Sequence, residues 1–323
     1  MAGRESLDDK LATLRSLRGQ IINSETLPEL RKRIGDRSNL VVAAAAAIAG
    51  ENTLNDLARD LEAAFDRFMA HPLKDDKLCR AKIAIVEALN KMEHQGTEIF
   101  RKAARHIQFE PAWGPPEDSA PPLRAAALIA LARIEGSSSL PLLVDALIDP
   151  SKEVRGAAAV AIGAVGTEGA GLVLRLKALI GDKDPDVLSE CLGGLLAVDH
   201  EENLSFVADF LDPIDADKCE AATLALGKSR LPEALEPLRM CLNRSVSREL
   251  NQQILLAIAI LRRPVAIDYL IELVATGPEP RAAASLTALR IYKDDSRIRE
   301  RIEAAVKERA SPALQAAFLR EFR

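Results

Sequence analysis

Aromatic residues are scarce in this sequence of 323 residues. They make up 3% of the chain, with one Trp and two Tyr, and the formal net charge is −5. Neutralising nucleic-acid phosphates needs a basic face, so the composition disfavours nucleic acid as a partner. Ala and Leu are abundant instead, and both favour closely packed helices. An all-α fold is therefore expected.

Residues suited to catalysis or metal binding are also few. The four cysteines form no CxxC pair and lie in apolar stretches, which predicts buried free thiols and a reducing compartment. The four histidines fall near helix ends in different parts of the chain, and phosphate-loop motifs are absent. The sequence thus predicts no enzyme activity and no catalytic, cofactor-binding or metal-binding residues. The four cysteines are Cys79, Cys191, Cys219 and Cys241, and the four histidines are His71, His94, His106 and His200.

Long apolar runs are missing as well. Residues 41–49 form the most apolar stretch, which is far shorter than the roughly 20 residues of a membrane span. The first residues carry frequent charges and show no signal-peptide core. We therefore expect a soluble cytoplasmic protein with no membrane partner.

The sequence does contain a repeat, marked by a small residue followed by Leu, Ile or Phe. Successive pairs are 29 to 33 residues apart in the later part and 41 or 42 apart in the first part. A second amphipathic segment precedes the later pairs, with Asp-Pro or Gly-Pro turns between, so each unit is predicted to be helix A, a tight turn and helix B. Gly136, Gly166 and Gly227 are predicted to adopt left-handed backbone at the ends of B helices. The pairs are Ala47-Ile48, Ala88-Leu89, Ala130-Leu131, Ala161-Ile162, Gly194-Leu195, Ala225-Leu226, Ala257-Ile258, Ala288-Leu289 and Ala317-Phe318.

Three parts of a single solenoid are predicted over residues 1–323. Residues 1–107 form irregular repeats, and residues 123–323 form regular ones. Between them, residues 108–122 (QFEPAWGPPEDSAPP) contain five prolines and the only Trp. This insert is predicted to be a non-helical loop.

The repeat resembles a known family. Residues 140–166 read LPLLVDALIDPSKEVRGAAAVAIGAVG, which is similar to HEAT repeats, particularly the short prokaryotic HEAT-like repeats also found in phycobilisome lyases. The resemblance implies a right-handed α-solenoid of about nine helical hairpins. It also implies that a turn Asp pairs with the Arg that opens helix B, and a spacing of six residues fits Asp149 with Arg155 and Asp118 with Arg124. These arginines are expected to be structural.

Charge is unevenly distributed along the later repeats. Residues 181–220 hold twelve acidic residues and two lysines, whereas residues 227–263 hold seven basic and three acidic residues. The acidic band is either a surface that steers a basic partner or a set of turn and N-cap residues. Trp113 is either an anchor for a partner or a side chain that packs back on the helices. The candidate partner-binding residues are Asp184, Asp186, Glu190, Asp215, Asp217, Glu220 and Trp113.

The repeat architecture favours a non-catalytic binding or scaffold protein, because stacked hairpins present a long surface to a protein or peptide, possibly a basic one. The resemblance leaves an enzymatic alternative, since HEAT-like repeats also occur in bilin lyases and in a class of DNA glycosylases. A third alternative is that the chain is one subunit of a larger assembly, docking through its end helices.

Overall fold

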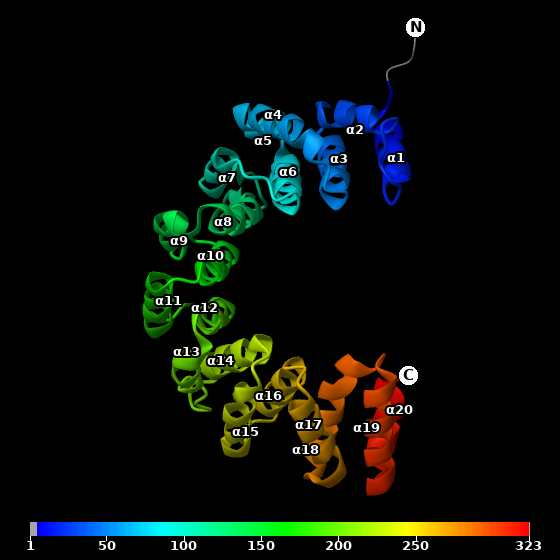
Figure 1. The fold of residues 1–323 in the computed structure, drawn as a ribbon, viewed down its shortest axis with the longest axis vertical. Helices are drawn as coiled ribbons and strands as arrows, with labels where there is room; N and C mark the ends of the chain where they lie inside the picture. Colours follow the sequence, from blue (N-terminus) through cyan, green and yellow to red (C-terminus); the bar gives the residue numbers. More distant parts are fainter. Residues whose placement is uncertain (1–4, 323) are drawn as a thin grey trace. The chain divides into compact units, whose positions relative to one another are not determined.

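The computed structural model describes residues 5–322 (Figure 1). These residues belong to two compact units. Unit 1 ends at Val165 and unit 2 begins at Gly166. Secondary structure in the described residues is helical apart from one two-stranded ribbon. The all-α prediction is confirmed, while the single solenoid over residues 1–323 stays a prediction.

Unit 1 contains α1 to α10 and both strands. Short 3-10 turns precede α4 at Asn55–Leu57, precede α6 at Lys77–Cys79 and follow α8 at Gly136–Ser139. The elements are α1 (Leu7–Leu17), α2 (Leu27–Ile34), α3 (Asn39–Glu51), α4 (Ala58–Ala70), α5 (Pro72–Asp75), α6 (Arg80–Lys91), α7 (Thr97–Ala104), β1 (Phe109–Glu110), β2 (Glu117–Asp118), α8 (Pro121–Glu135), α9 (Leu140–Ala146) and α10 (Lys152–Val165).

Unit 2 contains α11 to α20, with 3-10 turns at Pro232–Ala234 and Leu289–Tyr292. The helices are α11 (Glu168–Ile180), α12 (Pro185–Val198), α13 (His200–Ala208), α14 (Ala216–Ser229), α15 (Leu235–Arg244), α16 (Arg248–Ile260), α17 (Pro264–Thr276), α18 (Glu279–Ala288), α19 (Ser296–Arg309) and α20 (Pro312–Glu321).

Helices that are close in sequence pair into hairpins within each unit. In unit 1 the pairs are α2 with α3, α4 with α6, α7 with α8 and α9 with α10; in unit 2 they are α11 with α12, α13 with α14, α15 with α16, α17 with α18 and α19 with α20. The second helix of each hairpin packs on the second helix of the next hairpin within its unit. The described residues thus form four hairpins in unit 1 and five in unit 2, which agrees with the predicted number of about nine.

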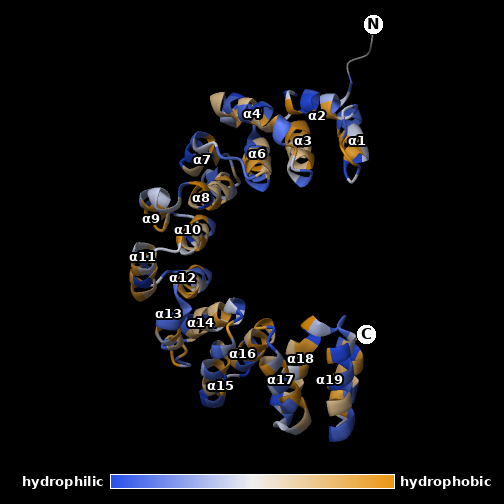
Figure 2. Cartoon of the chain, viewed as in Figure 1, coloured by the Kyte–Doolittle hydropathy of each residue, from blue (hydrophilic) through white to orange (hydrophobic). Residues whose placement is uncertain are grey.

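The predicted residue pairs lie on these second helices, apart from Leu289 in the 3-10 turn after α18, and they contribute to the core of each unit. The large member of every pair is buried, for example Ile48 on α3, Leu131 on α8 and Phe318 on α20. Each helix also carries hydrophilic residues, so its two sides differ (Figure 2). Burying one apolar side of each helix against the next hairpin is what stabilises a repeat array.

The three glycines predicted to adopt left-handed backbone differ from one another. Gly166 has a φ angle of 69°, whereas Gly136 combines a φ of 52° with a ψ of −129°, which lies outside the left-handed helical region. Gly227 lies within α14, and a Cβ atom there would come within 2.9 Å of the Ala257 backbone on α16. Its role is to let two helices approach closely, and Arg230, with φ 55°, supplies the left-handed residue after α14.

The insert over residues 108–122 is partly regular. Its strands β1 and β2 pair antiparallel, with Phe109 opposite Asp118 and Glu110 opposite Glu117. The prediction of a non-helical loop is wrong at its last two residues, because Pro121 and Pro122 form the first turn of α8. Proline suits that position, since the first turn of a helix needs no backbone N–H donor.

One helical stretch, Pro121–Ala146, is long and apolar enough to be a candidate membrane span by length and composition. Gly136 breaks this stretch between α8 and α9. Leu123, Leu128 and Leu131 on α8 are fully buried in the core of unit 1 or nearly so. We interpret the stretch as two core helices.

Candidate binding surfaces

Trp113 lies between the two strands of the insert and is fully exposed to solvent. The alternative in which this side chain packs back on the helices is therefore not seen. Phe109 on β1 is also more than half exposed, and Leu78, before α6, is half exposed. The hairpin formed by β1, β2 and their connection, residues 108–119, is called the Trp113 hairpin below.

The Trp113 hairpin is fixed at its base by Gln108, which is almost completely buried. The Gln108 backbone N–H donates to Asp118 Oδ1 at 3.0 Å, and its carbonyl accepts from Ser119 N at 2.9 Å. Its side-chain Nε2 donates to the Asp76 carbonyl at 2.9 Å and to Glu110 Oε1 at 2.7 Å. Three of these bonds close the base of the hairpin, and the bond to the Asp76 carbonyl ties that base to the chain that leads into α6.

A fully buried ion pair lies beneath this base. Lys82 Nζ is 3.3 Å from Asp76 Oδ2 and donates to Gln108 Oε1 at 2.9 Å. The Asp76 carboxylate also accepts from the backbone N–H groups of Ala81 and Lys82, at 2.9 and 3.1 Å, and so caps the start of α6. Buried charges need such compensation, because removing the partner of a buried charge costs ~3–5 kcal/mol.

The chain entering α6 is strained. Leu78 and Cys79 have φ angles of 60° and 52°, a left-handed conformation that costs of order 1–3 kcal/mol for each residue that is not glycine. The Leu78 N–H donates to Glu110 Oε1, which also accepts from Ser119 Oγ at 2.7 Å. The Trp113 hairpin and this strained turn therefore stabilise each other.

Three of the four cysteines have raised thiol pKa values, whereas the hydrogen bond with Cys219 lowers the pKa of Cys241. All four are buried and free, as predicted. Burial raises the pKa of Cys79, and it raises the pKa of Cys191 to about 12. The sequence predicted four separate cysteines, but Cys219 Sγ lies 3.5 Å from Cys241 Sγ. The hydrogen bond between these two thiols, together with burial, raises the pKa of Cys219. Protonated, buried thiols are poor nucleophiles.

The histidines are equally dispersed. His106 Nε2 lies 3.1 Å from Gln108 Oε1, and burial lowers the pKa of this imidazole below its ordinary value. His94 Nε2 contacts Glu62 Oε1 at 2.8 Å. Among residues 5–322, no group of three or more His, Cys, Asp or Glu side chains is arranged to hold a metal ion.

Several of the acidic candidates in unit 2 have structural partners. Asp184 and Asp215 are the N-cap residues of α12 and α14 and accept from backbone N–H groups of those helices. Asp215 also pairs with Lys218 at 2.6 Å, and Glu190 on α12 pairs with Lys228 on α14 at 2.8 Å. Helix capping thus accounts for Asp184 and Asp215.

The other three acidic candidates lie on the surface. Asp186 is exposed in the first turn of α12, and Asp217 and Glu220 are exposed on α14. Their part in partner binding stays a prediction.

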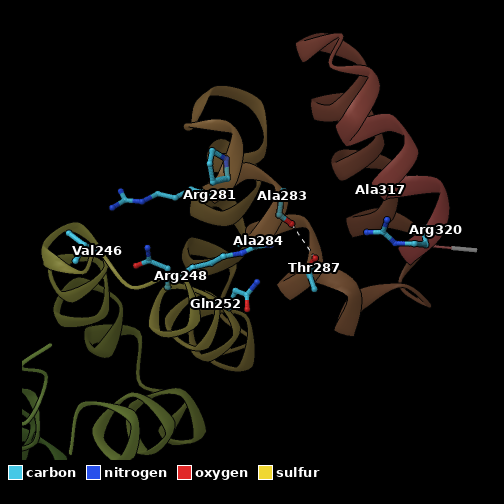
Figure 3. A pocket seen from close by; sticks show the side chains of 11 residues that line it. Val246, Arg248, Gln252, Arg281, Ala283, Ala284, Thr287, Ala317 and Arg320 are labelled. Carbon is cyan, nitrogen blue, oxygen red and sulfur yellow. Dashed lines mark hydrogen bonds between the residues drawn. The ribbon is translucent and has the colours of Figure 1, made fainter. Parts of the chain in front are cut away.

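Sequence reasoning missed a basic pocket in unit 2. It has a volume of about 390 Å³ and is lined by three arginines, Arg248 on α16, Arg281 on α18 and Arg320 on α20 (Figure 3). The excess of basic residues over residues 227–263 pointed to the region, but two of these arginines lie outside it. Only the stacking of α16, α18 and α20 brings the three together.

The family model for HEAT repeats matches residues 116–175. The matched residues include α8, α9 and α10 of unit 1. A comparison with curated proteins gave no match.

Similar solved structures include human deoxyhypusine hydroxylase in complex with glycerol, at 18% identity and a TM-score of 0.33, covering 77% of this chain and 96% of that one. The complex of CpcE and CpcF of phycocyanin lyase from Nostoc is similar at 16% identity and a TM-score of 0.36, covering 90% and 96%. An engineered protein is similar at 15% identity and a TM-score of 0.38, covering 97% and 93%. Similarity at this level says nothing about partner or activity.

Proposed function

We propose that the chain, which matches the HEAT-repeat family model over residues 116–175, works without catalysis, by binding another protein or a peptide. The observation that supports this most directly is the fully exposed Trp113 on a hairpin with a buried, hydrogen-bonded base. Four free, buried cysteines support a reducing compartment such as the cytoplasm.

Trp113 is suited to be the main anchor of a partner. A Trp side chain buries roughly 150–250 Å² on contact, and aromatic anchors of this kind dominate many interfaces. Because Gln108 and Glu110 hold the base of the hairpin, little backbone freedom is lost when a partner binds the tip. Phe109 and Leu78 add further exposed apolar surface near the base.

Affinity capture from cells with the purified chain tests this proposal. We expect the wild-type chain to retain a protein that the Trp113→Ala variant loses, with a loss of about 2 kcal/mol or more in binding free energy. Ile148→Ala is the matched control, because Ile148 is an exposed large apolar residue of the same unit outside the hairpin. Equal capture by both variants contradicts the proposal.

Trp113 also reports on binding directly, since it is the only Trp of the chain. We expect its fluorescence to be typical of indole in water in the free protein. On addition of the captured partner, the emission maximum is expected to move to shorter wavelength. An emission maximum that does not move on binding contradicts a role as anchor.

The exposed Asp217 and Glu220 are proposed to steer a basic segment of the same partner. Binding through such charges weakens as salt screens them, so the association rate is expected to fall between low and high ionic strength. The D217N/E220Q variant should associate more slowly at low salt. A salt-independent rate contradicts this part of the proposal.

The enzymatic alternatives, bilin lyase and DNA glycosylase, have a direct test. Binding of free bilin, or excision of an alkylated base from DNA by the purified chain, would replace the binding proposal. Burial of all four thiols argues against a cysteine nucleophile in either reaction, because a substrate cannot reach them.

A further inference from the structure

The basic pocket of unit 2 lies where the second helices of three successive hairpins meet. Arg248 is at the start of α16, Arg281 is in the first turn of α18 and Arg320 is near the end of α20. Between them the lining consists of small residues such as Ala283, Ala284 and Ala317, which leave room for a ligand (Figure 3). A volume of about 390 Å³ admits a few residues of an extended peptide.

The pocket carries an excess of positive charge. Its lining includes the three arginines and no Asp or Glu. The other polar lining residues, Asn251, Gln252 and Thr287, are neutral. Three guanidinium groups around one pocket attract an anionic ligand, and the attraction is stronger inside a concave surface than on a flat one.

Arg281 keeps its charge free for a ligand. Arg281 donates to Asn243 Oδ1 at 3.1 Å and to the Leu242 carbonyl at 2.8 Å, which fixes its orientation through neutral acceptors. Arg248 is exposed at the start of α16, next to Glu249. Arg320 differs, because its Nε donates to Glu321 Oε1 at 3.1 Å.

We propose that this pocket binds an acidic peptide segment of a partner protein. Carboxylates of two Asp or Glu side chains pair with Arg248 and Arg281, which line the pocket. Nucleic acid fits less well, because no aromatic side chain lines the pocket for base stacking. This site lies in unit 2 and goes beyond the proposed role of Trp113 in unit 1.

Fluorescence anisotropy with a labelled peptide tests the proposal on the full chain. The probe is a nine-residue peptide, Gly-Ser-Glu-Glu-Leu-Glu-Glu-Ser-Gly, and the matched probe carries Gln in place of each Glu. We expect the Glu peptide to bind at least about tenfold more tightly than the Gln peptide at low salt, with a smaller ratio at high salt.

Charge-reversed variants locate the binding. Arg248→Glu is expected to weaken binding of the Glu peptide at least about tenfold, because it removes one attraction and adds one repulsion. Arg297→Glu is the matched control, since Arg297 is an exposed arginine in α19 outside the pocket. It should change the affinity less than about twofold, because exposed charges outside the pocket contribute little. Circular dichroism checks that both variants keep their helices.

Three results would overturn the proposal. The first is equal affinity for the Glu and Gln peptides. The second is equal weakening of Glu-peptide binding by Arg248→Glu and Arg297→Glu. The third is that a single-stranded oligonucleotide binds more tightly than the Glu peptide and that Arg248→Glu abolishes this binding. A concentration-dependent dimer that Arg248→Glu dissociates would replace the peptide with a second copy of the chain. Trp113→Ala separates the two sites, because it should leave peptide affinity unchanged whether or not Trp113 anchors a partner.

Discussion

Arg124 binds the carboxylate of Asp149 with two parallel hydrogen bonds, Nε to Oδ2 and Nη2 to Oδ1, each of 3.0 Å. Its remaining nitrogen, Nη1, donates to Asp118 Oδ2 at 2.7 Å. One buried guanidinium thus joins the end of the Trp113 hairpin to the turn before α10. The predicted pairing of Asp118 with Arg124 is confirmed, and the link from Arg124 to the Asp of the next turn makes a short ladder between repeats.

Arg124→Ala is expected to destabilise unit 1 by about 3–5 kcal/mol, because it leaves two partly buried carboxylates without their cation. Urea unfolding followed by circular dichroism measures the loss. Arg133→Ala on the same helix is the control, since Arg133 is exposed and makes only long hydrogen bonds, of 3.3 and 3.4 Å. A similar loss in both variants would contradict the special role of Arg124.

The buried pair of Asp76 and Lys82 should respond unequally to removal of either partner. In Lys82→Met the Asp76 carboxylate keeps the N–H donors of Ala81 and residue 82, whereas in Asp76→Ala the Lys82 ammonium keeps only Gln108 Oε1. We therefore expect Asp76→Ala to cost about 3–5 kcal/mol and Lys82→Met clearly less. Chemical denaturation of both variants measures the order, and a reversed order would show that the ammonium is the better compensated charge.

Gly227→Ala and Gly193→Ala should have opposite effects, although both replace a glycine inside a helix. A Cβ atom at Gly227 would meet the Ala257 backbone at 2.9 Å, so overpacking is expected to cost about 1–3 kcal/mol. A Cβ atom at Gly193 meets nothing within 4 Å, so alanine there should stabilise α12 by about 0.5–1 kcal/mol through its helix propensity. Thermal unfolding of the two variants gives the signs, and equal signs would contradict close packing of α14 on α16.

His106 should make unit 1 less stable at mildly acidic pH. Burial holds its pKa in the folded state below the ordinary value of about 6.5, although the contact with Gln108 opposes this. As pH falls through about 6.5 the unfolded chain binds a proton first, so stability is lost until the pH passes the folded pKa. The free energy of unfolding, measured with urea between pH 7.5 and pH 5, should change less steeply with pH for His106→Asn than for the wild-type chain. An unchanged pH dependence would show that His106 is readily protonated in the folded protein.

The repeat itself was predictable because its signals are local. The Ala-Leu type pairs and the Asp-Pro turns recur within about one hairpin, and helix periodicity places their apolar side in the core. The glycines show the limit of such signals, because a glycine near a helix end fits either a left-handed cap or a close helix contact. Gly166 is the first kind and Gly227 the second.

The candidate sites depended on contacts between distant residues, which composition and spacing do not reveal. Gln108 meets Lys82, and Cys219 meets Cys241, only because the helices stack as they do. For the same reason, the pocket of Arg248, Arg281 and Arg320 draws on three hairpins. The sequence identified Trp113 as a candidate, but whether it would be buried depended on the polar base of its hairpin.

The pairing of helices that are close in sequence also bears on how the chain folds. Each helix finds its partners within one or two hairpins along the chain, so the loops that close during folding are short and their entropic cost is small. Chains with such local contacts fold quickly, and structure can start in any hairpin and spread to its neighbours. Hairpins can therefore form one after another while the ribosome is still synthesising the rest of the chain.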